Sequence, residues 1–228
     1  MDSRKRDARI AGSLYLLVGV TSAVEMSIPS VFVVRGDAAA TAARIASAPL
    51  TYRLYLTSGL VSQILFVFLA LALYQLLAGV NKRYAILMVA LVLVQVPIAF
   101  ANTLCGAAPL ALLNGANYWS AFDQTQLDAM TMGFLGVQSY GTSAVTAFWG
   151  LWLLPFGILV FQSGFIPRIL GVLLVIGCFV WLGISATSLL LPAYAGVANR
   201  FVPLAIGEIL IILWLVTVGA RAGRVDPR

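Results

Sequence analysis

The chain has 228 residues, of which 61% are hydrophobic and 10% are charged, and its formal net charge is +6. Soluble domains carry about 25% charged residues, so this composition excludes a water-soluble fold and predicts a polytopic membrane protein. The sequence contains no histidine, which removes the usual zinc ligand and the base of a serine nucleophile. Its basic residues lie in short loops beside apolar runs, a pattern typical of cytoplasmic loops, so we expect no nucleic-acid partner.

Six apolar segments are long enough to cross a membrane core of about 30 Å, which takes about 20 helical residues. The predicted spans are Ile10–Val31, Leu54–Leu77, Tyr84–Cys105, Met130–Phe161, Ile169–Leu191 and Val202–Ala220. The first continues in apolar character past the weak cleavage site Thr21-Ser-Ala23, so we expect an uncleaved anchor. The predicted fold is an all-α bundle of about six transmembrane helices that forms a single domain over residues 1–228.

The placement of lysine and arginine predicts the orientation of this bundle. Both termini and two loops share one side, and their basic residues are Arg4, Lys5, Arg6, Arg9, Lys82, Arg83, Arg168, Arg221, Arg224 and Arg228. The other side has Arg35, Arg44, Arg53 and Arg200. The excess on the first side predicts that both termini are cytoplasmic.

Two further segments carry local signals. The stretch GDAAATAARIASAP has Asp37 as an N-cap and ends at Pro49, which predicts a short outer-surface helix after the first span. The fourth span is longer than a membrane needs and contains Gly141, Gly150 and Pro155. We expect it to kink or to project beyond the bilayer.

The predicted spans contain two acidic residues, Glu25 and Glu208. Glu25 lies about 8 Å from the outer edge of the first span, and Glu208 lies about 9 Å below the outer edge of the last. The two acids are therefore expected to share one depth in the outer half. Acids within spans usually face the bundle interior and mark function. The alternative is that each glutamate merely bonds a neighbouring helix or reaches interfacial water.

Other polar side chains are expected in the same outer half, whereas the cytoplasmic half is mostly aliphatic. They include Gln63, Asn102, Gln138 and Tyr140. Together with the acids they suggest a polar chamber at or just below the outer surface. Trp149, Trp152 and Trp181 are candidates for the wall of a lipid-like ligand site, where ring faces stabilise a cation. The alternative for these tryptophans is ordinary packing or lipid contact.

The sequence lacks the residues that several kinds of active site require. The predicted spans contain no lysine, and there is no Asp-rich cluster, phosphate loop or Cys–His zinc pattern. We therefore expect neither a metal nor a cofactor. Cys105 and Cys178 are predicted at depths that differ by well over about 10 Å, too far apart for a disulfide.

Five stretches resemble an uncharacterised bacterial membrane family filed as domain of unknown function 4386. They are ARIAGSLYLLVGV, GDAAATAARI, LALYQLLAGVNKRYAILMVALVLVQVPIAF, FWGLWLLPFGILVFQSGFIPRILGVLLVIGCF and LAIGEILIILWLV. The similarity covers nearly the whole chain, and SGFIPRILG and the terminal IGE are its most specific parts. The resemblance implies a multi-pass protein of the bacterial inner membrane, and Glu208 falls on the family's GE motif. It carries no established activity to transfer.

These features support three functional hypotheses. The first is a metal-independent enzyme of cyclase or isomerase type acting on a lipophilic, isoprenoid-like substrate. Glu25 or Glu208 would be its general acid or base, Gln138 and Tyr140 would orient the substrate, and the tryptophans would shape the apolar wall. The second is a proton-coupled carrier or a sensor, which lacks support from inverted repeats or broken helices. The third is a non-catalytic accessory subunit. The expected partner is a membrane lipid or a lipophilic small molecule.

Overall fold

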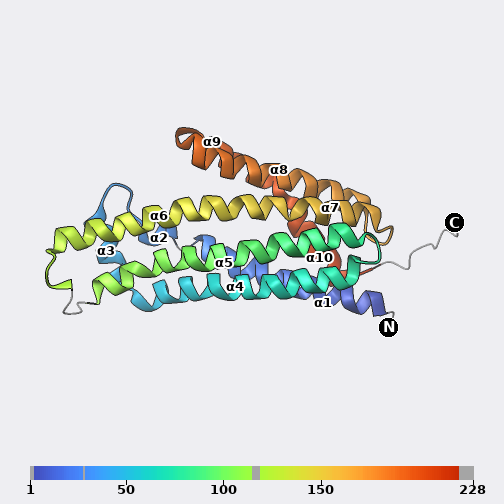
Figure 1. The fold of residues 1–228 in the computed structure, drawn as a ribbon, viewed down its shortest axis with the longest axis horizontal. Helices are drawn as coiled ribbons and strands as arrows, with labels where there is room; N and C mark the ends of the chain where they lie inside the picture. The colour runs from blue at the N-terminus through green and yellow to red at the C-terminus, as the bar shows by residue number, and fades with distance from the viewer. Residues whose placement is uncertain (1–2, 28, 115–118, 221–228) are drawn as a thin grey trace.

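The computed structural model describes residues 3–27, 29–114 and 119–220, and its regular elements in these ranges are all helices (Figure 1). In chain order they are α1 (Ser3–Ser27), α2 (Pro29–Phe32), α3 (Ala38–Ser47), α4 (Pro49–Leu77), α5 (Lys82–Leu113), α6 (Gln124–Leu151), α7 (Leu153–Gln162), α8 (Arg168–Leu190), η2 (Pro192–Tyr194), α9 (Ala195–Ala198), η3 (Asn199–Ile206) and α10 (Gly207–Thr217). Six stretches of these residues are long and apolar enough to cross a membrane. The prediction of a helical, multi-pass membrane protein is confirmed.

The last span differs from its prediction. It was expected to begin at Val202, whereas the apolar stretch runs over Pro192–Thr217. Its first part consists of the 3₁₀ segments η2 and η3 and the short helix α9, and a longer regular α-helix begins only at Gly207. Pro192 and Pro203 have no backbone N–H, so regular α-helical hydrogen bonding is interrupted there. This irregular segment carries Glu208 further into the bundle than the sequence suggested.

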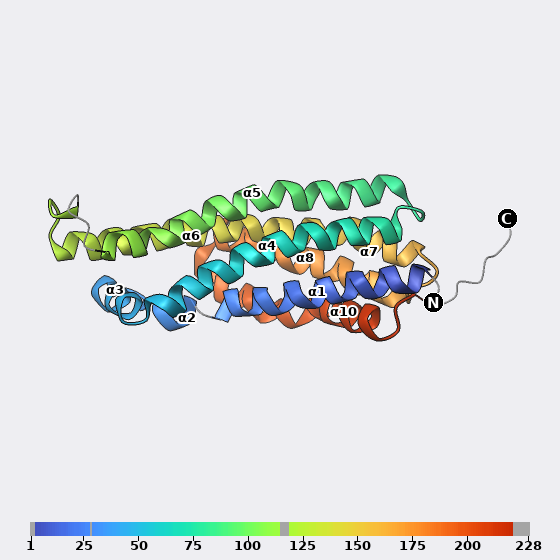
Figure 2. The same cartoon turned by 90° about the horizontal axis from the view of Figure 1, so that it is seen from below.

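The six spans form a ring. Helix α1 packs against α4, α4 against α5, α5 against α6 and α7, and both of these against α8. Helix α10 then packs against both α8 and α1, which closes the ring. Figures 1 and 2 show that α1 begins and α10 ends at the same end of the molecule. The cytoplasmic location of that end stays a prediction, and Arg221, Arg224 and Arg228, on which it partly rests, lie outside the described residues.

Local signals explain where several helices begin and break. The Asp37 carboxylate accepts a hydrogen bond from the Ala40 N–H at 2.8 Å, so the predicted N-cap and its short helix are confirmed. The long fourth span breaks at Trp152, between α6 and α7. Pro155 lies at the start of α7 and cannot donate to the Leu151 carbonyl, which is the physical cause of the break.

Two apolar cores divide the length of the bundle. The larger core lies towards the end where α1 begins, and includes Leu69, Leu73, Met88, Phe156 and Ile211. A smaller core joins α2, α3 and the adjoining end of α4, and consists of Phe32, Ile45, Tyr52, Tyr55 and Leu56. Helices α4, α5 and α6 extend past α1 and α8 to reach α3 (Figure 2). The fourth span therefore extends past its neighbours, as α4 and α5 do, and its projection beyond the bilayer stays a prediction.

The inward stripe of α4 changes character between the two cores. The centre of this stripe consists of buried residues three or four positions apart: Tyr52, Tyr55, Gly59, Ser62, Phe66, Leu69, Leu73 and Leu76. Hydroxyl-bearing side chains therefore occupy the half towards α3, and apolar ones the half towards the termini. This agrees with the asymmetry expected from the sequence. Cys178 is buried in the larger core, and both it and Cys105 are free thiols, as predicted.

Two glycines of α1 provide a test of how α10 closes the ring. A Cβ at Gly12 would lie 2.7 Å from the Val216 nitrogen and 2.8 Å from the Leu215 carbonyl carbon, so Gly12→Ala must push α10 away. A Cβ at Gly19 would meet only the Ile212 Cδ1 atom, at 3.7 Å, an ordinary contact. We expect Gly12→Ala to destabilise the fold by about 1–3 kcal/mol. Gly19→Ala should leave stability unchanged. Thermal unfolding midpoints in detergent would measure both, and equal midpoints would contradict this packing.

Candidate functional site

A partly open cavity of about 500 Å³ lies between the helices of the ring. Its walls come from α1, α4, the α6–α7 junction, α8, η3 and α10. The lining residues are Tyr15, Val18, Gly19, Ser22, Ala23, Met26, Ser62, Gln63, Phe66, Trp149, Trp152, Trp181, Val202, Pro203, Ala205, Ile206, Glu208, Ile209 and Ile212. Ligand cavities are typically about 300–1,000 Å³, mostly apolar, with a few placed polar groups. This cavity fits that description in both size and composition.

Glu208 is the acidic residue of this cavity. It lies in the first turn of α10, and hydrogen bonds from two other helices hold its carboxyl group. The Tyr15 hydroxyl of α1 donates to Oε2 at 2.8 Å, and the Trp181 Nε1–H of α8 donates to Oε1 at 2.8 Å. Both carboxyl oxygens are therefore engaged, which fixes the orientation of the side chain at the cavity wall.

Aromatic rings surround this carboxyl group. Trp149 and Trp181 meet edge to face, with ring centroids 5.8 Å apart. Trp152 lies edge-on to Tyr15 at 5.7 Å and to Phe66 at 4.8 Å. Trp152 is only 2% exposed, so its ring serves mainly as packing, whereas Trp149 and Trp181 are partly exposed. All three tryptophans line the cavity, and a contact with a ligand stays a prediction for each of them.

A second polar group lines the cavity from α1 and α4. The hydroxyls of Ser22 and Ser62 are hydrogen-bonded at 2.8 Å. One residue further along α4, the Gln63 Oε1 atom accepts a hydrogen bond of 3.0 Å from the Nε2 atom of Gln95 in α5. Gln95 is fully buried, and Gln63 is 6% exposed. The cavity therefore has polar groups on its α4 wall as well as at Glu208.

Glu25 lies apart from the cavity lining. Its carboxyl group rests on Gly59 of α4, where a Cβ atom would come within 2.9 Å of Oε1. Glu208 instead bonds Tyr15, which precedes Glu25 by about 15 Å of helical rise along α1. The expected shared depth of the two acids is therefore wrong, because the irregular start of the last span places Glu208 deeper.

Asn102 and Gln138 join neighbouring helices rather than line the cavity. The Gln138 Nε2 atom donates to the Tyr55 hydroxyl at 3.0 Å, and its amide lies over Gly106 of α5. The Asn102 Nδ2 atom donates to the Thr142 hydroxyl at 3.1 Å. In both cases the side chain connects two spans.

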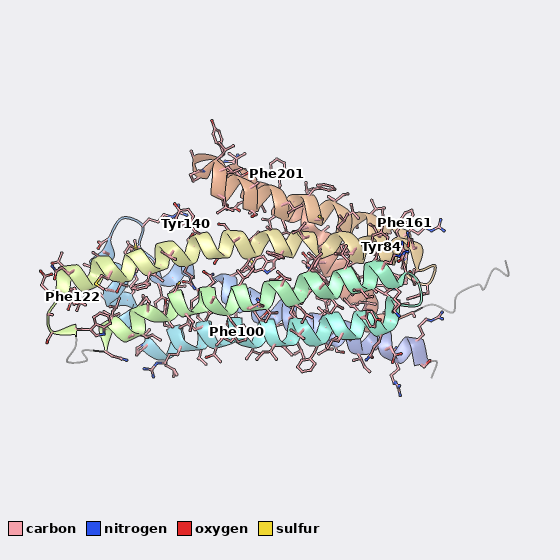
Figure 3. The ribbon with its side chains drawn as sticks, in the orientation of Figure 1. Tyr84, Phe100, Phe122, Tyr140, Phe161 and Phe201 are labelled. Atoms are coloured by element: carbon pink, nitrogen blue, oxygen red, sulfur yellow. The ribbon has the colours of Figure 1, made fainter. Side chains whose placement is uncertain are left out.

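Tyr140 also lies outside the cavity. Its side chain is 64% exposed, and Figure 3 shows it on the side of α6 that faces away from α5. Two residues apart on a helix lie about 200° apart around its axis, so Tyr140 and Gln138 cannot share an inward face. The hypothesis that both orient one substrate is therefore not supported.

Five of the residues expected at a site line the cavity: Gln63, Trp149, Trp152, Trp181 and Glu208. Sequence reasoning missed Tyr15, the Ser22–Ser62 pair and Gln95. Tyr15 is the hydroxyl-bearing aromatic residue of an otherwise apolar run, which is a usable signal. Its partner depends on the packing of α1 against α10, which the sequence pattern does not reveal. Among the described residues, no group of three or more Asp, Glu or Cys is placed to bind a metal ion.

The hydrogen bond between Tyr15 and Glu208 yields a stability prediction. Tyr15→Phe keeps the ring against Trp152 and Phe156 but removes the hydroxyl donor. Leaving the Glu208 oxygen without this donor should destabilise the fold by about 1–3 kcal/mol, visible as a lower unfolding midpoint. Tyr84→Phe is the matched control, since no side-chain hydrogen bond of Tyr84 is present in the described part of the chain. Equal losses in both variants would contradict a specific role for Tyr15.

Comparison with known proteins places this arrangement in a family. No curated protein and no solved structure matches the chain. Residues 10–219 match the family described as domain of unknown function (DUF4386). This match begins within α1 and includes all of α10, so the cavity and the residues that hold Glu208 lie within it. The chain belongs to the DUF4386 family.

Proposed function

We propose that the protein binds a lipophilic, isoprenoid-like molecule in the cavity and uses Glu208 as an acid or base on it, in a reaction of isomerase or cyclase type. The observation that carries the proposal is the Glu208 carboxyl group, held by Tyr15 and Trp181 at the wall of an otherwise largely apolar cavity. An apolar wall suits the body of such a substrate, and a fixed carboxyl group suits proton transfer to or from it.

The hydrogen bonds of Glu208 are compatible with proton transfer. The Trp181 indole N–H only donates, so Oε1 is an acceptor whether or not the carboxyl group carries a proton. A phenolic hydroxyl both donates and accepts, so the Tyr15 O–H bond can rotate when Oε2 gains or loses a proton. The group can therefore change its protonation state and keep both partners. The mechanism assigned to Glu208 is proton delivery to, or removal from, a carbon of the bound substrate.

The substrate would reach this cavity from the lipid phase. Several lining residues of α1, η3 and α10 are apolar and also strongly exposed: Met26 at 55%, Ile206 at 48% and Ile209 at 60%. An apolar opening favours a hydrophobic molecule that partitions into the bilayer. The family resemblance implies the bacterial inner membrane, and the distribution of lysine and arginine favours an orientation with both termini in the cytoplasm.

The alternative is a protein that binds a lipophilic molecule without chemistry, as a sensor or an accessory subunit. The largely apolar lining supports this role equally, because binding needs no acid. A proton-coupled carrier has less support. Towards the end where α1 begins, the interior consists of the larger apolar core, and a carrier needs a polar route through it.

The variant Glu208→Gln separates the two roles. Glutamine keeps the shape of the side chain and can still bond Tyr15 and Trp181, but it cannot exchange a carboxyl proton. We expect purified wild-type protein to carry a defined lipophilic molecule, and Glu208→Gln to carry its unprocessed precursor. Mass spectrometry of the extracted small molecules would measure this. Wild-type protein kept in D₂O buffer should incorporate deuterium into the bound molecule, and the variant should not.

Glu25→Gln is the matched control, because Glu25 lies outside the cavity lining. It should behave as the wild type in both measurements. Identical extracts from wild type and Glu208→Gln, with no deuterium in either, would contradict the acid–base role and favour binding without chemistry. Bulk phospholipid alone in every sample would contradict the binding of a defined molecule.

A further inference from the structure

We infer that Gln63 is a hydrogen-bonding subsite for a hydroxyl group of the ligand, which makes the ligand a lipophilic alcohol rather than a hydrocarbon. This inference rests on the proposed function, because it concerns the same cavity. It adds a second polar contact, on the α4 wall, to the carboxyl group of Glu208 on α10. Gln63 contacts the ligand, and Gln95 of α5 acts as a positioning residue behind it.

The first support is the hydrogen-bond state of Gln63. Its Oε1 atom accepts from Gln95 at 3.0 Å, which leaves its Nε2 atom without a hydrogen-bond partner among the described residues. Gln63 lines the cavity, so its amide group is placed to donate to a molecule that binds there. A hydroxyl oxygen accepts from an amide N–H and its proton donates to an amide oxygen, so a hydroxyl suits Gln63 in either orientation of the amide.

The second support is the burial of Gln95. This side chain is fully buried, and its Oε1 atom has no hydrogen-bond partner in the described part of the chain. A buried polar atom without a partner lowers stability, and an apolar residue would avoid that loss. The contact that Gln95 makes with Gln63 fixes the direction of the Gln63 amide. A positioning role therefore explains a glutamine at this place in α5.

The third support comes from the neighbouring serines. Ser22 and Ser62 line the same cavity and share one hydrogen bond of 2.8 Å. Only one of two hydroxyl protons lies between the oxygens of such a pair, so the other remains available to another acceptor. Since Ser62 directly precedes Gln63, these groups form one polar patch on the α1–α4 side. A hydrocarbon would leave this patch unpaired, whereas an alcohol would satisfy it.

The experiment measures which of two matched molecules the full-length protein retains in detergent. Wild-type protein is dialysed against equal amounts of farnesol and farnesene, and in parallel against geraniol and myrcene. Retained molecules are quantified by gas chromatography after correction for protein-free micelles. We expect wild type to favour the alcohol by roughly tenfold or more, since the hydrocarbon leaves the Gln63 amide unpaired. Gln63→Leu should reduce that preference to near one.

Three variants control the interpretation. Gln75→Leu changes an exposed glutamine of the same helix and should keep the wild-type preference. Gln95→Leu should weaken the preference, because Gln63 then lacks the contact that orients it. The double variant Gln63→Leu/Gln95→Leu removes both buried amides. It should unfold at or above the wild-type midpoint while showing no preference, which separates loss of recognition from loss of folding.

Three results would overturn the inference, and they are distinguishable. If wild type retains alcohol and hydrocarbon equally above the micelle background, the cavity binds lipophilic molecules and the Gln63 subsite is wrong. If wild type retains neither class above that background, the proposed function fails for isoprenoid-like molecules, and the subsite fails with it. An unchanged preference in Gln63→Leu would likewise assign alcohol recognition to another group.

Discussion

The ring of helices depends on one carboxyl group that three spans share. Glu208 stands at the start of α10 and receives hydrogen bonds from Tyr15 of α1 and Trp181 of α8. These are the two spans between which α10 closes the ring. At Gly12, nearer the N-terminus of α1, the backbones of α1 and α10 come into direct contact beside Leu215 and Val216. The cavity lies beside these hydrogen bonds, and part of its wall comes from η3, the 3₁₀ segment that precedes α10. The same segment of the chain therefore positions Glu208 and borders the cavity.

The polar side chains between this cavity and α3 have a different role. Glu25 lies over Gly59, Gln138 over Gly106 and Asn102 over Gly141, each on a neighbouring span. Each glycine provides the room that a larger residue would fill, which lets a polar side chain lie against the opposite backbone. Small residues at helix contacts are common in membrane bundles for this reason. Polar residues inside the spans therefore serve helix packing in this region, whereas Ser22, Ser62, Gln63 and Glu208 line the cavity.

The sequence predicted the fold well because hydrophobic length and capping act locally. The six spans, the Asp37 cap and the break near Pro155 all follow from residues close together in the chain. The site was predicted only in part. The predicted depth of Glu208 was wrong because residues 192–201 were assigned to a loop before the last span, whereas η2, α9 and η3 pack against α8 as part of that span. The expectation that Gln138 and Tyr140 orient one substrate is not supported, because the depth of a residue in the membrane does not show which way its side chain points around the helix axis. Tyr15 was missed because its partner lies at the far end of the chain.

The length of α4 has a mechanical consequence. This helix runs without an internal proline through Tyr52, in the smaller core, and Gln63, in the cavity wall, to Leu77 at the other end. An unbroken helix of this kind behaves as a nearly rigid rod, so a tilt imposed at one end moves every side chain along it. A molecule that presses on α3 or on the adjoining end of α4 would therefore displace Gln63 without touching the cavity. The extended end of α4 is thus mechanically connected to the cavity wall at Gln63.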